Sequence, residues 1–152
     1  MESNLRHPYQ FQETDNNTFW FETDDGLKYQ AYFIEFPTIN YKLYSFSFDK
    51  EDGLKHFDRR IKDTVICILR EFCSADNQIL AYTCDVSDGH ELARKRLFNK
   101  WFNEENDGSF AKFDFQSENI YVSLIAKKNF FPIVNQAITD VNQLFADVIS
   151  NK

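Results

Sequence analysis

One stretch decides how this chain begins to fold: Phe19-Trp20-Phe21-Glu22-Thr23-Asp24-Asp25-Gly26-Leu27-Lys28-Tyr29. Aromatic and polar side chains alternate on both sides of its Asp-Gly pair, and a period of two is typical of β-strands with one buried face. Asp-Gly between two such runs predicts a hairpin with a type I′ turn, because glycine tolerates a positive φ. The chain is therefore expected to open with antiparallel strands.

The same alternation extends outward from this hairpin. It covers residues 9–14 before the hairpin, continues through its second arm over 27–36, where Pro37 closes the strand, and returns over 43–48. Four runs of this kind predict an antiparallel meander with one face in the core.

The hydrophobic period then changes. Residues 58–75 and 90–105 carry apolar side chains at helical spacing, and a long amphipathic helix is expected from Asn129 to the carboxyl terminus. Short apolar runs at 78–84, 110–115 and 120–126 read as strands, the last two as a hairpin. The order β-β-β-β-α-β-α-β-β-α predicts an α+β fold, with a mainly antiparallel sheet and the helices packed on one face.

Size and composition place limits on the class of protein. A chain of 152 residues with 17% aromatic residues predicts one domain over residues 1–152, with 1–7 frayed. The net charge of −7 disfavours nucleic acid as a partner. No run is apolar enough for a membrane span, no signal peptide is evident, and three cysteines without a CxxC pair favour a cytoplasmic location.

The familiar catalytic signatures are missing from the sequence. It contains no glycine-rich phosphate loop, no GxSxG elbow and no HExxH motif. Its histidines, His7, His56 and His90, stand far apart. We therefore expect no metal site and no bound cofactor.

The segment from Asp85 to Arg96 breaks the local pattern, because a strand ends there in a polar turn that opens a helix. Asp88 is placed to cap that helix, and Glu91 three residues later would complete a capping pair. That structural role accounts for both acids without any site.

Arg94 projects from inside the apolar arc of the same helix, with His90 one turn earlier on that face. A guanidinium facing a core needs a carboxylate or several carbonyl partners, because an unpaired buried charge costs several kcal/mol. One interpretation pairs Arg94 with Asp85, or with a carboxylate on a neighbouring strand, so that the pair holds the strand–helix corner. The other makes the segment a binding site for an anion or a partner's carboxylate. The candidate binding residues are Asp85, Asp88, His90, Arg94 and Arg96.

The sequence resembles an uncharacterised domain family from Bacteroidota over about residues 8–130. The resemblance is carried by the aromatic hairpin at 19–29, the helix that starts Arg60-Ile61-Lys62-Asp63-Thr64-Val65, and Tyr82-Thr83-Cys84-Asp85 with the basic run that follows it, Arg94-Lys95-Arg96-Leu97-Phe98. The family has no assigned activity, so the resemblance implies a bacterial cytoplasmic domain and nothing about mechanism.

Two functions remain open at this point. The favoured hypothesis is a protein-interaction or regulatory domain without catalysis, whose partner is another protein or a second copy that docks through the carboxyl-terminal helix. The alternative is a metal-assisted enzyme, or a binder, that acts on a phosphorylated small molecule or nucleotide at Asp85–Arg96, where carboxylates would hold a cation and arginines would bind phosphate.

Overall fold

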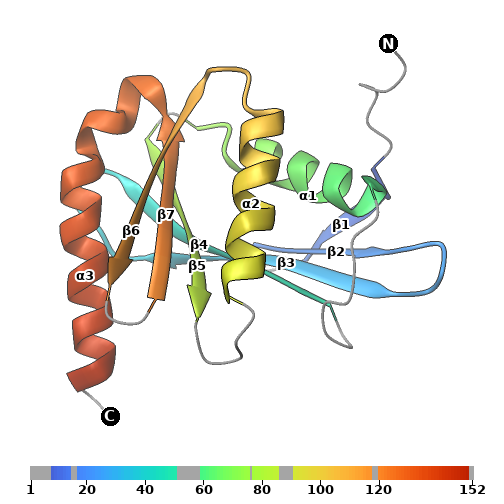
Figure 1. The fold of residues 1–152 in the computed structure, drawn as a ribbon, viewed down its shortest axis with the longest axis horizontal. Helices are drawn as coiled ribbons and strands as arrows, with labels where there is room; N and C mark the ends of the chain where they lie inside the picture. The colour runs from blue at the N-terminus through green and yellow to red at the C-terminus, as the bar shows by residue number, and fades with distance from the viewer. Residues whose placement is uncertain are drawn as a thin grey trace. The chain divides into compact units, whose positions relative to one another are not determined.

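The computed structural model describes residues 8–14, 17–50, 59–75, 77–85, 91–117 and 120–150 (Figure 1). Its elements in chain order are β1 (Phe11–Thr14), β2 (Thr18–Glu22), β3 (Lys28–Phe36), β4 (Lys42–Lys50), α1 (Arg59–Phe72), β5 (Gln78–Asp85), α2 (Glu91–Glu105), β6 (Phe110–Ser117), β7 (Ile120–Lys127), the 3-10 helix η3 (Lys128–Ile133) and α3 (Val134–Ser150).

The predicted α+β class is confirmed, and the residues described contain three α-helices and a seven-stranded, mostly antiparallel sheet in the order β1-β2-β3-β4-β5-β7-β6. The element order differs from the expected one by η3, which replaces the first turn of the predicted last helix. Pro132 lies inside η3, and a proline disfavours α-helical dihedrals at the residue before it. The α-helix consequently begins only after this proline, at Val134.

The chain divides into two compact units, one made of residues 1–34 and 46–75 and the other of residues 35–45 and 76–152. Strands β3 and β4 each contribute residues to both units. The expectation that 1–7 are frayed falls outside the described residues, and the expectation of a single domain stays a prediction.

The predicted hairpin of the first unit is confirmed, with Glu22 opposite Lys28 in the β2–β3 register. Its turn is closed by a 3.0 Å hydrogen bond from Gly26 N to Thr23 O, and Gly26 has φ +83°. The predicted type I′ turn is wrong, because it needs positive φ at two central residues and Asp25 has none. A type I turn followed by a left-handed glycine fits this geometry.

Aromatic rings fill the core of the first unit. Phe21 stacks on Tyr29 with ring centroids 5.2 Å apart, and Phe33 stacks on Phe72 of α1 at 3.7 Å. Tyr29, Ala31 and Phe33 are buried on one face of β3, as the alternation predicts. The unit thus has a core of its own, built mainly from phenylalanine and tyrosine.

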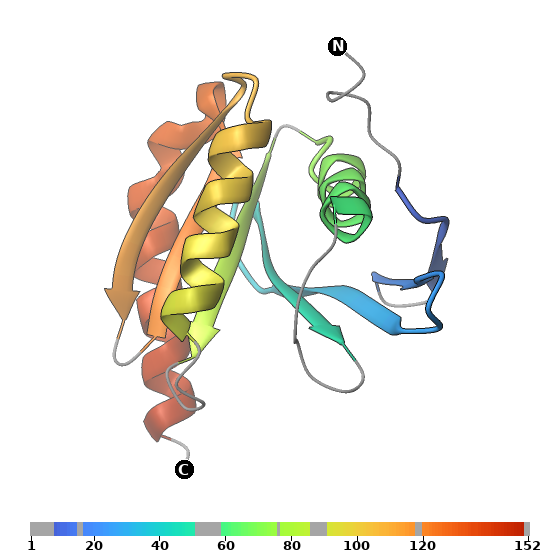
Figure 2. The ribbon, with the colours of Figure 1, turned by 45° about the vertical axis from the view of Figure 1, so that its right-hand side comes forward.

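In the second unit, α2 and α3 lie on opposite faces of the sheet formed by β5, β7 and β6 (Figures 1 and 2). On one face, Tyr82 stacks on Phe98 of α2 with centroids 4.0 Å apart. On the other, Ala81 and Leu124 share a buried cluster with Ala137 of α3. The expected packing of all helices on one face is therefore wrong for this unit.

Strand β7 shows why the second unit needs two helices. Its residues 122–126 are all buried, although their side chains point alternately to the two faces. A continuous buried run of this kind is typical of a strand that is covered on both sides. A sheet with a solvated face would instead have shown the alternation seen in β3.

Candidate functional site

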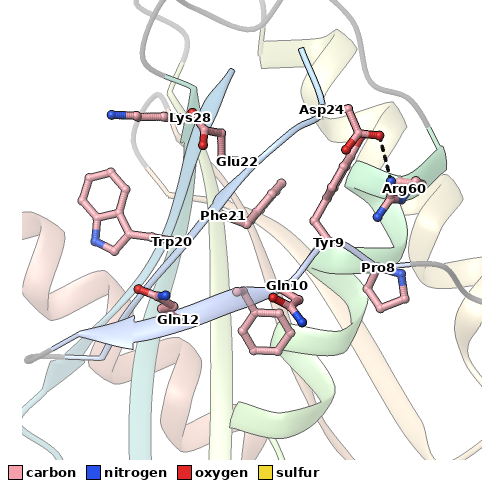
Figure 3. Close-up of a pocket in the computed structure, with 11 residues that line it drawn as sticks. Pro8, Tyr9, Gln10, Gln12, Trp20, Phe21, Glu22, Asp24, Lys28 and Arg60 are labelled. Atoms are coloured by element: carbon pink, nitrogen blue, oxygen red, sulfur yellow. Dashed lines mark hydrogen bonds and ion pairs between the residues drawn. The ribbon is translucent and has the colours of Figure 1, made fainter. Parts of the chain in front are cut away.

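A pocket of about 980 Å³ opens in the first unit beside the start of β1 (Figure 3). Its walls come from the segment before and within β1, from the β2–β3 hairpin, and from the first turn of α1. The lining residues are Pro8, Tyr9, Gln10, Phe11, Gln12, Trp20, Phe21, Glu22, Asp24, Lys28 and Arg60.

Hydrogen bonds to α1 fix the chain where it enters β1. The backbone N–H of Tyr9 donates to Thr64 Oγ1 at 2.8 Å, and that hydroxyl donates to the carbonyl of Arg60 at 2.6 Å. Thr64 is completely buried, so this bridge is shielded from water. The wall of the pocket formed by residues 8–12 is thereby held against the helix that supplies Arg60.

Arg60 joins three parts of the pocket. Its guanidinium carbon lies 3.9 Å from the centroid of the Tyr9 ring, and its Nη1 lies 3.0 Å from Asp24 Oδ2 (Figure 3). The Asp24 side chain is 80% exposed, and an exposed ion pair contributes only about 0.2–1 kcal/mol. A carboxylate from a partner could therefore replace Asp24 at small cost.

Trp20 supplies the large apolar surface of the pocket. It is 40% exposed on β2, where the register places Gln12 of β1 and Gln30 of β3 on either side. Phe21, the next residue, points to the buried face and stacks beneath Tyr9, with centroids 6.0 Å apart. An exposed indole flanked by amides suits stacking and hydrogen bonding with an extended ligand.

The charged groups of the pocket balance one another. Glu22 and Lys28 are cross-strand partners, and Arg60 is paired with Asp24. The pocket wall contains no serine, cysteine or histidine within the described part of the chain. This set of side chains is suited to binding by stacking and hydrogen bonds.

The five residues predicted to form a site at the strand–helix turn are only partly covered by the structure. Asp85 ends β5 opposite Ile120, and Arg94 belongs to α2, but the side chains of both residues lie outside the described part of the structure. Asp88 and His90 lie wholly outside the described residues. Arg96 is exposed on α2. The proposed grouping of these residues stays a prediction.

A polar cluster that sequence reasoning missed lies under α2 in the second unit. Lys112 Nζ donates to both carboxylate oxygens of Asp114 at 2.7 and 2.8 Å, and Ser123 Oγ donates to the same carboxylate at 2.6 Å. Lys95 Nζ lies 4.8 Å from the centroid of the Tyr121 ring. The alternation of β6, which sets Lys112 and Asp114 on one face, was the signal available.

Electrostatics in this cluster favours the ionised carboxylate. Burial raises the pKa of Asp114, but the hydrogen bonds from Lys112 and Ser123, with the positive charges of Lys112 and Lys95, bring its pKa below the ordinary value. The cluster is therefore a stabilised ion network that joins β6 and β7.

A buried tyrosine connects α3 to the rest of the second unit. The Tyr41 hydroxyl donates to Asp140 Oδ2 at 2.6 Å, and burial together with this carboxylate raises the pKa of Tyr41. The exposed side chains of α3 that lie on its outer side are mostly polar, namely Asn135, Gln136, Thr139, Asn142, Gln143 and Asp147. A dimer through α3, which stays a prediction, would have to bury these groups.

Among the helices in the described ranges, none combines the length and apolar character that a membrane crossing requires. No curated protein and no solved structure matches the chain. A model for a family of unknown function does match residues 57–142, more than half of the chain, and this region contains α1, α2 and the whole β5–β7–β6 sheet. Of the described residues that line the pocket, Arg60 alone falls within the matched region. The chain therefore belongs to the family of unknown function DUF6169.

Proposed function

We propose that this chain is a non-catalytic interaction domain, and that the pocket of the first unit binds an extended segment of a partner protein. The observation that carries the proposal is the position of Trp20, an exposed indole in a pocket that runs along the start of β1. A cytoplasmic, bacterial setting remains part of this proposal.

The position of β1 favours an extended ligand. This strand is terminal in the sheet order, so within the described residues it has a strand neighbour on one side only. Extended peptides add to such edges through backbone hydrogen bonds, while adjacent pockets select their side chains. The wall of the pocket includes residues 8–12, so a strand added to β1 would run beside this part of the wall.

The side chains of the pocket indicate the chemistry of the partner. Trp20 would stack on an aromatic or aliphatic residue, and Gln12 beside it would hydrogen-bond the peptide backbone. Arg60 would accept an acidic residue in exchange for Asp24. With two acidic and two basic residues in its wall, the pocket suits a segment of mixed charge and disfavours a polyanion such as nucleic acid.

Selection from a library of random ten-residue peptides tests the proposal. The full chain would be immobilised, and peptides that also bind the bare support would be removed. We expect the enriched peptides to carry an apolar side chain that contacts Trp20. We also expect Trp20→Ala to weaken their binding at least tenfold, because a tryptophan that becomes buried in an interface contributes about 2 kcal/mol or more to the binding free energy. Fluorescence anisotropy of labelled peptides gives the affinities.

Ile34→Ala is the matched control. Ile34 is a large apolar residue of β3, 50% exposed, that does not line the pocket, so its removal should leave the affinities unchanged. The proposal fails if selected peptides bind wild type and Trp20→Ala equally well, or if Ile34→Ala weakens them as much.

The alternative at the strand–helix turn, a metal-assisted enzyme or a binder of a phosphorylated small molecule or nucleotide, stays a prediction. The exposure of Arg96 on α2 is compatible with it.

A further inference from the structure

Strand β6 forms the other end of the sheet, and its backbone pairing with β7 determines which of its groups point outward. Lys128 N donates to Ser109 O at 3.0 Å, next to the Phe110–Lys127 pair of the ladder. In an antiparallel pair, bonded and non-bonded positions alternate. The odd-numbered residues of β6 therefore bond to β7, and the N–H and C=O groups of Lys112 and Asp114 point to its open edge, where no strand pairs within the described part of the chain.

A side chain already occupies the first part of that edge. Asn106 Nδ2 donates to Phe110 O at 2.9 Å, and Phe110 N donates to Asn106 Oδ1 at 3.3 Å. The carboxamide thus binds Phe110 as the backbone of a neighbouring strand would. The edge that remains for another strand begins at Lys112.

The side chains on this part of β6 differ between its two faces. Phe113 is 40% exposed, and its ring centroid lies 6.1 Å from that of Phe115 on the same face. Lys112 and Asp114 lie on the opposite face, bound to each other at 2.7 Å. An exposed phenylalanine thus stands between a cation and an anion on a strand with an open edge.

We propose that β6 pairs with the β6 strand of a second copy in an antiparallel, two-fold symmetric dimer centred on Phe113. In this register Lys112 lies opposite the partner's Asp114, and Asp114 lies opposite the partner's Lys112. The outward N–H and C=O groups of these residues bond across the axis, and Phe113 packs against the partner's Phe113.

Charge selects this register over its neighbours. A shift by two residues in one direction places Lys112 opposite the partner's Lys112, and a shift in the other direction places Asp114 opposite the partner's Asp114. Like charges directly opposite each other on paired strands are destabilising. A shift by one residue would face outward backbone groups with inward ones and lose the hydrogen bonds.

The proposed interface uses only residues of the second unit, so it does not depend on the peptide pocket. A few backbone bonds, one aromatic pair and four alternating charges make a small interface, and small interfaces bind weakly. We expect dimers at roughly 100 µM protein and mainly monomers at roughly 1 µM.

Cross-linking of cysteine variants tests the register directly. Phe113→Cys should form a disulfide-linked dimer under a mild oxidant, because residues opposite each other at a non-bonded position have Cα atoms about 4.5 Å apart. Phe115→Cys should not, since the two copies of residue 115 would lie four residues apart along the strands, about 13 Å. The wild-type chain, with its three cysteines, gives the background.

Dimers in both variants, in neither, or in Phe115→Cys alone would each overturn the proposed register. The two variants remove the same kind of ring from the same face of one strand, so they are matched. Circular dichroism shows whether each is folded.

Sedimentation velocity on charge variants tests the recognition without cysteines. Lys112→Glu should lower the dimer fraction at roughly 100 µM at least fivefold, because acidic side chains would then face each other. The exchange variant Lys112→Asp/Asp114→Lys keeps opposite charges opposite and should still dimerise. Lys100→Glu, at an exposed position of α2, is the matched control and should dimerise as wild type does.

Loss of the dimer in the exchange variant while it persists in Lys112→Glu would overturn the charge pairing. A wild-type chain that stays monomeric over the whole concentration range would overturn the dimer itself.

Discussion

The carboxylate of Asp114 accepts two hydrogen bonds from Lys112 and one from Ser123. Strand alternation makes the pairing of Lys112 with Asp114 foreseeable from sequence. The contribution of Ser123 is not foreseeable, because only the register of β6 and β7 places it opposite Asp114. Likewise, the sequence identified Arg94 as anomalous, but its partner depends on a tertiary neighbour that alternation cannot supply.

Asp114→Asn should lower the free energy of unfolding by about 1 kcal/mol at pH 7, a value reduced for the partial exposure of the side chain. The pKa of Asp114 is lowered in the folded state, so the ionised carboxylate stabilises folding above the unfolded pKa of about 3.9. That contribution is lost as the pH falls below this value toward the folded pKa.

Urea unfolding of both proteins between pH 7 and pH 3 measures the difference, which should narrow below about pH 4. Asp25→Asn removes the same charge from an exposed turn position and should change stability by less than about 0.5 kcal/mol. A difference between wild type and Asp114→Asn that is constant over this pH range would contradict the ionic account.

At the scale of elements, nearly every strand and helix follows from hydrophobic period, and the misses have local causes. The predicted type of the β2–β3 turn was wrong because an Asp-Gly pair also fits a type I turn followed by a left-handed glycine. The prediction that all helices pack on one face was wrong for the second unit because β7 is buried on both of its faces, which indicates a covering layer on each side.

The attachment of α3 depends strongly on one hydroxyl. Tyr41→Phe should lower the free energy of unfolding by about 1.5 kcal/mol at pH 8, since it removes a hydrogen bond to a charged acceptor, Asp140. The pKa of Tyr41 is raised in the fold, so its contribution is fully present below the unfolded value of about 10 and is lost as the pH rises above it.

Urea unfolding at pH 8 and at pH 11 should therefore show a smaller difference between wild type and Tyr41→Phe at the higher pH. Tyr121→Phe, at a partly exposed position of β7, is the control for loss of a phenol. Amide exchange in α3 that is unchanged by Tyr41→Phe would contradict the role of this hydrogen bond.

At the scale of the whole molecule, the chain has two compact units, each with its own core, and two strands that belong to both. Composition and length predicted one domain, and neither quantity shows how the apolar side chains divide between the two cores. Because β3 and β4 pass through both units, we expect a single cooperative unfolding transition.

Leu124→Ala tests this expectation from inside the second unit. Leu124 is fully buried, so the substitution should lower the free energy of unfolding by about 2–5 kcal/mol. Native-state amide exchange should show the loss in the most protected amides of both units alike. A loss confined to residues 35–45 and 76–150 would mean that the two units unfold separately.

The carboxamide of Asn106 binds both backbone groups of Phe110 and so determines how much of the β6 edge can pair with another strand. At β6 this contact leaves the short segment that begins at Lys112 for another strand, and in the proposed dimer one copy occupies it. The proposed assembly through β6 would therefore be finite. Removal of the Asn106 side-chain amide would lengthen the edge available for pairing by a residue pair. It would also favour pairing in shifted registers, which is the first step toward open-ended aggregation.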